Sequence, residues 1–138
     1  MILLDTDTLT LYFAGHPRVI ERIKVSEEVP VTSIISRIEV LQGRFDSVVK
    51  AADGDQLLRA QERLAIAEQS LAKFTLVEFT TDAASEFDRL RPNKKLKKIG
   101  RKDLLIACIA LAHRATLVTR NRQHFQHVPG LRLEDWAG

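Results

Sequence analysis

Short apolar runs recur along the chain and are separated by segments with the residue spacing of helices. Ile2-Leu3-Leu4 is closed by an acidic residue, which is typical of a buried first strand. Similar runs over 29–32, 74–79, 116–119 and 131–136 predict four further strands. Strands that alternate with helices indicate an α/β domain with a central parallel sheet and helices on both faces. Such sheets bind ligands beyond the carboxyl ends of their strands.

Helices are predicted between the first strands. Residues 8–14 carry apolar side chains at helical spacing, and Pro17 opens a second helix that ends at Val25. Ser33 is the expected N-cap of a third helix, which ends at Gly43.

Helical patterns continue in the second half of the chain. A helical hairpin is predicted over 46–73, with a break near Asp53-Gly54-Asp55, and another helix begins near Thr81 and runs toward Pro92. The most periodic helix begins at Asp103, which is followed by apolar residues three, four, seven and eight positions further on.

The composition fits one domain over residues 1–138. With 45% hydrophobic residues, 138 residues can bury one core but not two cores of ordinary size. The longest apolar run, 104–112, has nine residues, whereas a membrane-spanning helix needs about 20. The N-terminus lacks the basic segment of a secretory signal, so a cytoplasmic location is expected. Cys108 is the single cysteine, and its apolar neighbours predict a position in the core.

Positive charge is concentrated in one segment of the chain. Eight of the 21 Lys and Arg residues lie within 89–102, which contains no Asp or Glu, so the rest of a chain of net charge +3 is acidic. A local positive field of this kind favours an anionic partner. A solvated surface that only maintains solubility explains the segment equally well.

Three acids fall at one end of the predicted sheet. Asp5 ends the first strand, Glu39 lies at the edge of the buried side of its helix, and Asp103 opens the most apolar helix. An ionised carboxylate beside apolar neighbours is costly unless something pairs with it. Helix capping explains Asp5 and the helix dipole explains Asp103, but neither explains Glu39. Oxygen ligands without clustered Cys or His favour Mg²⁺ or Mn²⁺, so the three acids predict a hard-cation site.

Asn121 lies at the same edge, because it follows the strand predicted over 116–119. Its side-chain oxygen can complete the ring of ligands. A turn residue that bonds to its own backbone is the alternative explanation.

Five segments, in the same order and spacing, make the chain resemble a PIN-domain ribonuclease of the VapC toxin type. The resemblance covers nearly the full length. The segments are 3–7 (Leu-Leu-Asp-Thr-Asp), 32–39 with Gly43, 99–107, 117–121 with His124-Phe125, and 129–136.

The resemblance implies a PIN-like fold, RNA cleavage that depends on Mg²⁺ or Mn²⁺, a cognate VapB-like antitoxin and a homodimer. The conserved acids of the family correspond to Asp5, Glu39 and Asp103. We assign Asp5 and Asp103 as direct metal ligands, with Glu39 completing the ligand set or orienting the attacking water.

Three further positions correspond to the family's site. The fourth metal-site position, an acid in many PIN domains, is Asn121, which is assigned as a ligand or as a donor just outside the ligands. Thr119 resembles the family's hydroxyl residue beside the site. Asp7 stands where the motif more often ends in Asn, and it either adds a water-mediated ligand or caps the first helix.

RNA binding requires cations around the acids, because Lys and Arg contacts to phosphate supply most of the affinity that is independent of sequence. His124 is expected to contact substrate or to fix the last loop, and residues 94–98 either join this rim or project away from it. Four basic residues beside the predicted ligands are expected to rim the site: Arg101, Lys102, Arg120 and Arg122.

An antitoxin is expected to lay an apolar segment into a groove of the protein. Core packing is the alternative role of the apolar residues from which such a groove would be built. These are Leu9, Tyr12 and Phe13 in the first helix, and Leu57, Leu58, Leu64 and Leu71 in the hairpin.

Two other functions compete with the nuclease. One is a PIN-like domain that binds RNA without cleaving it. The other is a phosphatase of the haloacid-dehalogenase type, in which Asp5 attacks phosphorus and Asp7 acts as general acid and base. Leu9 at the fifth motif position, and the lack of a close acid pair after a late strand, count against the phosphatase.

Overall fold

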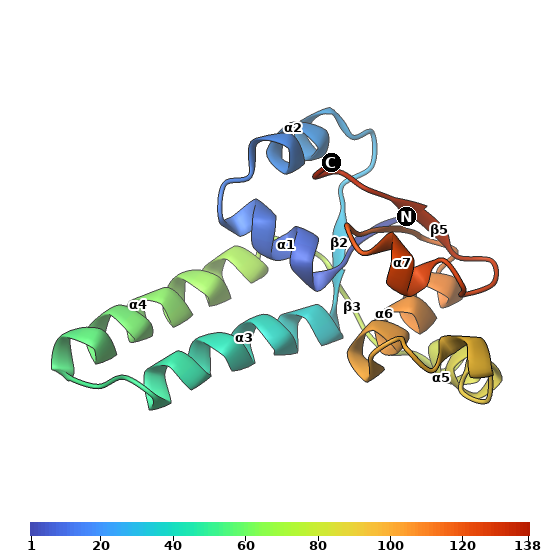
Figure 1. Cartoon of the computed structure of the whole chain (residues 1–138). Coiled ribbons are helices and arrows are strands. Elements are labelled where there is room, and N and C mark those ends of the chain that lie inside the picture. The colour runs from blue at the N-terminus through green and yellow to red at the C-terminus, as the bar shows by residue number, and fades with distance from the viewer.

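A parallel sheet forms the centre of the computed structural model, which describes residues 1–138 (Figure 1). The five strands lie in the order β3-β2-β1-β4-β5, and every neighbouring pair is parallel. The predicted parallel sheet is therefore confirmed. Its strands are β1 (Ile2–Leu4), β2 (Val31–Ser33), β3 (Leu76–Val77), β4 (Thr116–Val118) and β5 (Arg132–Glu134).

The strand order reverses at β1. The chain passes from β1 to β2 and β3 on one side, and then returns to β4 and β5 on the other. Leu4 pairs with Thr32 of β2 and with Val118 of β4. Open parallel sheets bind ligands where the strand order reverses in this way. The residues just beyond β1 and β4, Asp5 and Thr119, therefore meet at that point.

Helices cover both faces of the sheet, as predicted. Alternate residues of a strand face opposite sides. Leu3 of β1 packs into a core with α5 and α6, whereas Leu4 packs into a second core with α1 and α4. The helices are α1 (Thr6–Phe13), α2 (Pro17–Val25), α3 (Ile34–Val49), α4 (Gly54–Leu71), α5 (Thr81–Leu90), α6 (Arg101–Ala112) and α7 (Arg122–Phe125), with a 3₁₀ turn, η1, at Lys94–Leu96.

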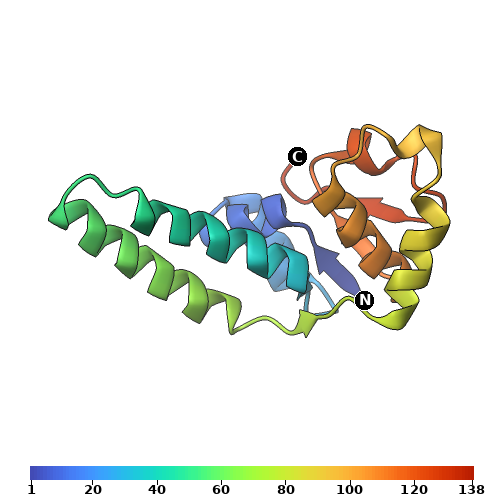
Figure 2. The same ribbon diagram turned by 90° about the horizontal axis from the view of Figure 1, so that it is seen from below.

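The helices α3 and α4 form a long antiparallel hairpin that extends away from the sheet (Figures 1 and 2). The prediction that the third helix ends at Gly43 is wrong. Gly43 does not have the positive φ of a helix stop, and α3 continues to Val49 because its second half packs against α4. The predicted break is confirmed, since Asp53 is the N-cap of α4.

Several other bounds differ from the predictions: β3 and β5 are shorter than the strands predicted over 74–79 and 131–136, and α6 begins at Arg101 rather than at Asp103. β2 begins at Val31 rather than at residue 29, because Val29 is 82% exposed and Pro30 has no N–H to donate to the sheet. The short helix α7 was not predicted, because its four residues are too few to show helical periodicity.

No helix is both long and apolar enough to cross a membrane. Cys108 is fully buried in the larger core, as predicted, and burial raises the pKa of its thiol to about 11.

Candidate functional site

Asp5 connects β1 to α1 and lies at the centre of the candidate site. Its backbone is extended, and its Oδ1 atom accepts a hydrogen bond of 2.8 Å from the backbone N–H of Thr8, so it is the N-cap of α1. The residue is 3% exposed and takes part in none of the ion pairs of the structure. Burial raises the pKa of its carboxyl group, although hydrogen bonds from Thr119 and Thr8 act in the opposite direction.

Thr119 holds the other side of Asp5. It follows β4 directly, is fully buried, and forms a side-chain hydrogen bond with the Asp5 carboxyl group. Its hydroxyl oxygen accepts a hydrogen bond of 2.9 Å from the backbone N–H of Asn121. The side chain of Thr119 therefore lies between the Asp5 carboxyl group and the backbone N–H of Asn121.

Glu39 reaches the same region from α3. Its Oε1 atom accepts a hydrogen bond of 2.8 Å from the hydroxyl of Thr6, the residue that follows Asp5. The hydroxyl of Ser36 lies 2.9 Å from that of Thr6, one turn before Glu39 on α3. The Glu39 Oε2 atom lies 3.8 Å from Nζ of Lys102. Glu39 is therefore tied to the start of α1 and to the first turn of α6.

Asp103 lies in the first turn of α6, next to Lys102. Its Oδ2 atom is 3.3 Å from Nδ1 of His124 in α7. The side chain of Asp103 is about one-third exposed, so it faces solvent at the end of the sheet. The position of α6 beside α3 brings Asp103 to the side of the site on which Glu39 lies.

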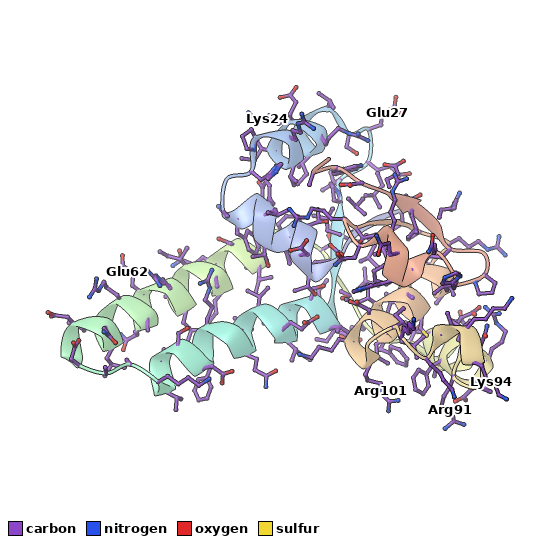
Figure 3. All side chains as sticks on the ribbon, in the orientation of Figure 1. Lys24, Glu27, Glu62, Arg91, Lys94 and Arg101 are labelled. Carbon is purple, nitrogen blue, oxygen red and sulfur yellow. The ribbon has the colours of Figure 1, made fainter.

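Two of the four expected basic residues pair with acids at the site, and the other two do not. Lys102 contacts Glu39, and Arg120 lies 3.2 Å from Asp7, so both are held beside acids at the site. Arg122 begins α7 and is exposed. Arg101 instead stacks its guanidinium on Phe87 of α5, at 4.9 Å from the ring centroid, and points outward at the start of α6 (Figure 3).

Asn121 is exposed and Asp7 is half-buried, and both lie near the site. Asn121 is the N-cap of α7, and its side chain makes no capping hydrogen bond. Asp7 lies in the first turn of α1 and pairs with Arg120, while Asp5 rather than Asp7 caps that helix.

The three predicted ligands approach the site from β1, α3 and α6, but each is held by a different partner. No group of three or more Asp, Glu, His or Cys side chains lies close enough together to hold a metal ion. The chemistry of the donors nevertheless fits a hard divalent cation, because Asp5, Glu39 and Asp103 offer only carboxylate oxygens. The buried charge of Asp5 also lacks a cation to balance it.

Sequence reasoning missed the hydroxyl pair of Thr6 and Ser36. Ser36 is fully buried three residues before Glu39, so the two share one face of α3. A serine on the buried side of a helix, in register with an acid, is the signal that points to such a pair. The contact between His124 and Asp103 supports the alternative in which His124 fixes the last loop.

Known proteins with similar sequences fall in one group. A family model described as "PIN domain" matches residues 2–131. "Ribonuclease VapC1" of Haemophilus influenzae (strain R2866) is 30% identical over 139 residues, which cover 98% of this chain and 97% of that protein. The "tRNA(fMet)-specific endonuclease VapC" of Salmonella typhimurium is 26% identical over 138 residues, with the same shares covered.

Two solved structures of VapBC proteins have folds similar to that of this chain. The structure of VapBC-1 from nontypeable Haemophilus influenzae has a TM-score of 0.81 and 24% identity, and the match covers all of both chains. That of VapBC2 from Rickettsia felis, bound to a DNA fragment from its promoter, has a TM-score of 0.78 and 27% identity, with 99% of each chain covered.

Proposed function

Because the chain belongs to the PIN domain family, in its VapC group, we propose that it is a metal-dependent endoribonuclease and the toxin of a toxin–antitoxin pair. The observation that carries the proposal is the buried carboxylate of Asp5, which has no cationic partner and lies where the strand order reverses. A buried carboxylate without a cationic partner destabilises the folded protein. A site that needs a negatively charged ligand for a metal ion explains why this carboxylate is present.

Mg²⁺ or Mn²⁺ is the proposed cofactor. Asp5 and Asp103 are its proposed direct ligands, and Glu39 is either a third ligand or the residue that orients the attacking water. When bound, such an ion activates water and neutralises charge on the phosphate.

The chain's own residues position the reacting groups. Thr119 orients the carboxyl group of Asp5, and the hydroxyl pair of Thr6 and Ser36 orients Glu39. Lys102 and Arg120 lie beside acids of the site, where they can attract the phosphate of the substrate. Asn121 and Arg122 extend this exposed rim.

The first test is cleavage of RNA by the purified protein without antitoxin. Total RNA and initiator tRNA are incubated with Mg²⁺ or Mn²⁺; the tRNA is included because two of the relatives are named as tRNA(fMet)-specific endonucleases. We expect discrete products that disappear with EDTA and with Asp103→Ala. Circular dichroism of Asp103→Ala controls for folding.

The competing functions give different results with variants of Asp103 and Asp7. A domain that only binds RNA yields no products that depend on Asp103. A phosphatase that uses Asp7 as general acid and base loses its phosphatase activity with Asp7→Asn, whereas the nuclease keeps most of its RNA cleavage, because Asp7 is not a proposed direct ligand.

The proposed partner is a VapB-like antitoxin. The two solved structures described above are VapBC assemblies, and this chain has an apolar hollow of about 420 Å³ between α1, α2 and α4. Tyr12 and Phe13 line the hollow, whereas Leu9 and Leu71 are buried core residues. Leu57 and Leu58 lie exposed on α4, outside this hollow. The hollow is therefore the proposed groove.

A homodimer is also proposed, because the family resemblance implies one. Several large apolar residues are exposed on α3 and α4, including Phe45 and Val49. Light scattering after size exclusion, with and without antitoxin, measures the number of subunits directly.

A further inference from the structure

A basic hollow of about 820 Å³ lies beside the candidate site, between the η1 segment and α7. Ile99 is the one hydrophobic residue among the eight that line it. One wall consists of four lysines, Lys94, Lys95, Lys97 and Lys98, which we call the lysine wall. None of the site residues assigned above belongs to this wall.

The lysine wall is fixed to the core by the residues between its lysines. Leu96 and Ile99 are 6% and 9% exposed and belong to the larger core, whereas all four lysines are exposed. The carboxamide of Asn93 caps the turn by accepting a hydrogen bond from the backbone N–H of Lys95. The apolar residues therefore turn inward and hold the four ammonium groups on the solvent side.

The opposite wall is anchored in the same way. Phe125 and Val128 are 1% and 3% exposed, while Gln123, His124 and His127 face the hollow. Both walls are thus attached to the same core, and the hollow between them is a fixed feature of the fold.

The charge of the hollow is not balanced by the protein. No Asp or Glu lines it, and none of the four lysines takes part in an ion pair. Lysines that are held together with unpaired charges repel one another, and a bound polyanion relieves that repulsion.

His124 connects the hollow to the candidate site. It lines the hollow, and its Nδ1 atom lies 3.3 Å from Oδ2 of Asp103. We propose that the lysine wall binds backbone phosphates of the RNA strand next to the phosphate that is cleaved. This inference rests on the proposed ribonuclease function, and it adds a binding subsite to it.

A single-stranded RNA fits this hollow better than an acidic polypeptide does. Protein segments that dock on a surface gain most of their binding free energy from apolar and aromatic anchors, and Ile99 is the only hydrophobic residue here. A nucleic acid backbone instead presents a row of phosphates, which lysines contact without reading the bases.

Lys97→Gln/Lys98→Gln tests the proposal, with Arg18→Gln/Lys24→Gln as the matched control. Both variants remove two exposed cations, but the control pair lies on α2, at the other end of the molecule from Lys94 (Figure 3). The probe is a fluorescein-labelled 2′-O-methyl oligoribonucleotide, which resists cleavage, and fluorescence anisotropy measures its binding over a range of salt concentrations. Thermal unfolding followed by circular dichroism checks that both variants fold.

We expect Lys97→Gln/Lys98→Gln to lower the affinity about tenfold at ~0.1 M salt, and to reduce the slope of log K against log salt by about 1.4, or ~0.7 for each phosphate that the variant no longer neutralises. The control variant should bind like the wild type. With a cleavable RNA, the lysine variant should raise KM and leave kcat nearly unchanged, because the chemical step is not altered.

Two results overturn the subsite alone. In the first, the wild-type protein cleaves RNA, but the lysine variant binds RNA as tightly as the control variant does. In the second, the lysine variant binds RNA normally but binds polyglutamate more weakly than the wild type does, which identifies an acidic polypeptide as the ligand. If the wild-type protein neither binds nor cleaves any RNA, the proposed function fails, and the subsite fails with it.

Discussion

Asp5 has two roles that act in opposite directions on the stability of the fold. Its Oδ1 atom caps α1 through Thr8, and its buried charge has no cation beside it. Asn caps a helix as well as Asp does, without the charge. Asp5→Asn should therefore raise the free energy of unfolding near neutral pH by about 1 kcal/mol, because it removes the buried charge and keeps the cap, while it abolishes RNA cleavage.

The pH dependence of this gain follows from the raised pKa of Asp5. The folded protein binds the Asp5 proton more tightly than the unfolded chain does, so the contribution of Asp5 to stability is fully present below the ordinary pKa of 3.8 and is lost as the pH rises through the folded value. Asp5→Asn and the wild type should have similar stability at acidic pH and diverge as the pH increases.

Urea unfolding over a pH series measures the divergence, with Asp5→Ala as the control that removes both charge and cap. The loss of the cap should cost Asp5→Ala about 1 kcal/mol relative to Asp5→Asn. A constant difference between Asp5→Asn and the wild type at every pH would show that the buried charge is not the cause.

Thr6 tests whether the orientation of Glu39 matters for catalysis. Its hydroxyl donates to Glu39 at 2.8 Å and lies 2.9 Å from that of Ser36. Thr6→Val removes the donor at nearly constant volume, so kcat/KM should fall about tenfold, as is usual when a group that orients a metal ligand is lost. Thr6→Ser keeps the hydroxyl and should restore most of the activity. If Thr6→Ser is as impaired as Thr6→Val, the methyl group rather than the hydrogen bond is what matters.

The candidate acids could be found from the sequence because each lies at a fixed distance from a strand or helix boundary. Asp5 directly follows an apolar run, and Asp103 lies in the first turn of a periodic helix, so local patterns place both. The hydrogen bond between Thr6 and Glu39 joins residues 33 positions apart. It depends on how α3 packs against α1, and a local pattern carries no information about that.

At the scale of elements, most helices and strands were predictable, and Gly43 explains the largest error. A glycine ends a helix when it adopts a positive φ, as Gly15 does after α1 at +84°. Gly43 instead lies within α3. The sequence records the residue but not its backbone angle, because that angle is decided here by the packing of α3 on α4.

Gly43→Ala should therefore stabilise the protein. A Cβ atom at this position meets nothing within 4 Å, and alanine in a helix is favoured over glycine by about 1 kcal/mol. Gly15→Ala is the matched control, because a left-handed conformation costs an alanine about 1–2 kcal/mol. Thermal and urea unfolding should show opposite shifts for the two variants, with RNA cleavage unchanged for Gly43→Ala. Shifts of the same sign would contradict this account.

At the scale of the whole molecule, the parallel sheet was predictable but the strand order was not. Alternating strands and helices indicate parallel pairing, but they do not say that β1 lies between β2 and β4. That order brings Asp5 and Thr119 together. A helical hairpin was predicted over 46–73, but its full length was not, because that length depends on α3 continuing past Gly43 (Figure 2).

The apolar hollow between α1, α2 and α4 can be tested as the antitoxin groove without disturbing the core. Val29 lines the hollow and is 82% exposed, so Val29→Asp should leave folding and RNA cleavage intact. A carboxylate there would be desolvated by an apolar segment of the antitoxin, so affinity should fall at least about tenfold, which corresponds to ~1.4 kcal/mol.

Val25→Asp is the matched control for the groove, because Val25 is also exposed, at 63%, and does not line the hollow. Calorimetric titration with the purified cognate antitoxin, and inhibition of RNA cleavage by that antitoxin, give two independent readouts. If Val29→Asp alone escapes inhibition while it still cleaves RNA, the hollow is the contact surface. If both variants escape inhibition equally, the contact surface also includes α2 as far as Val25. If neither variant escapes inhibition, the antitoxin binds another face, and the exposed apolar residues of α3 and α4 are the next to test.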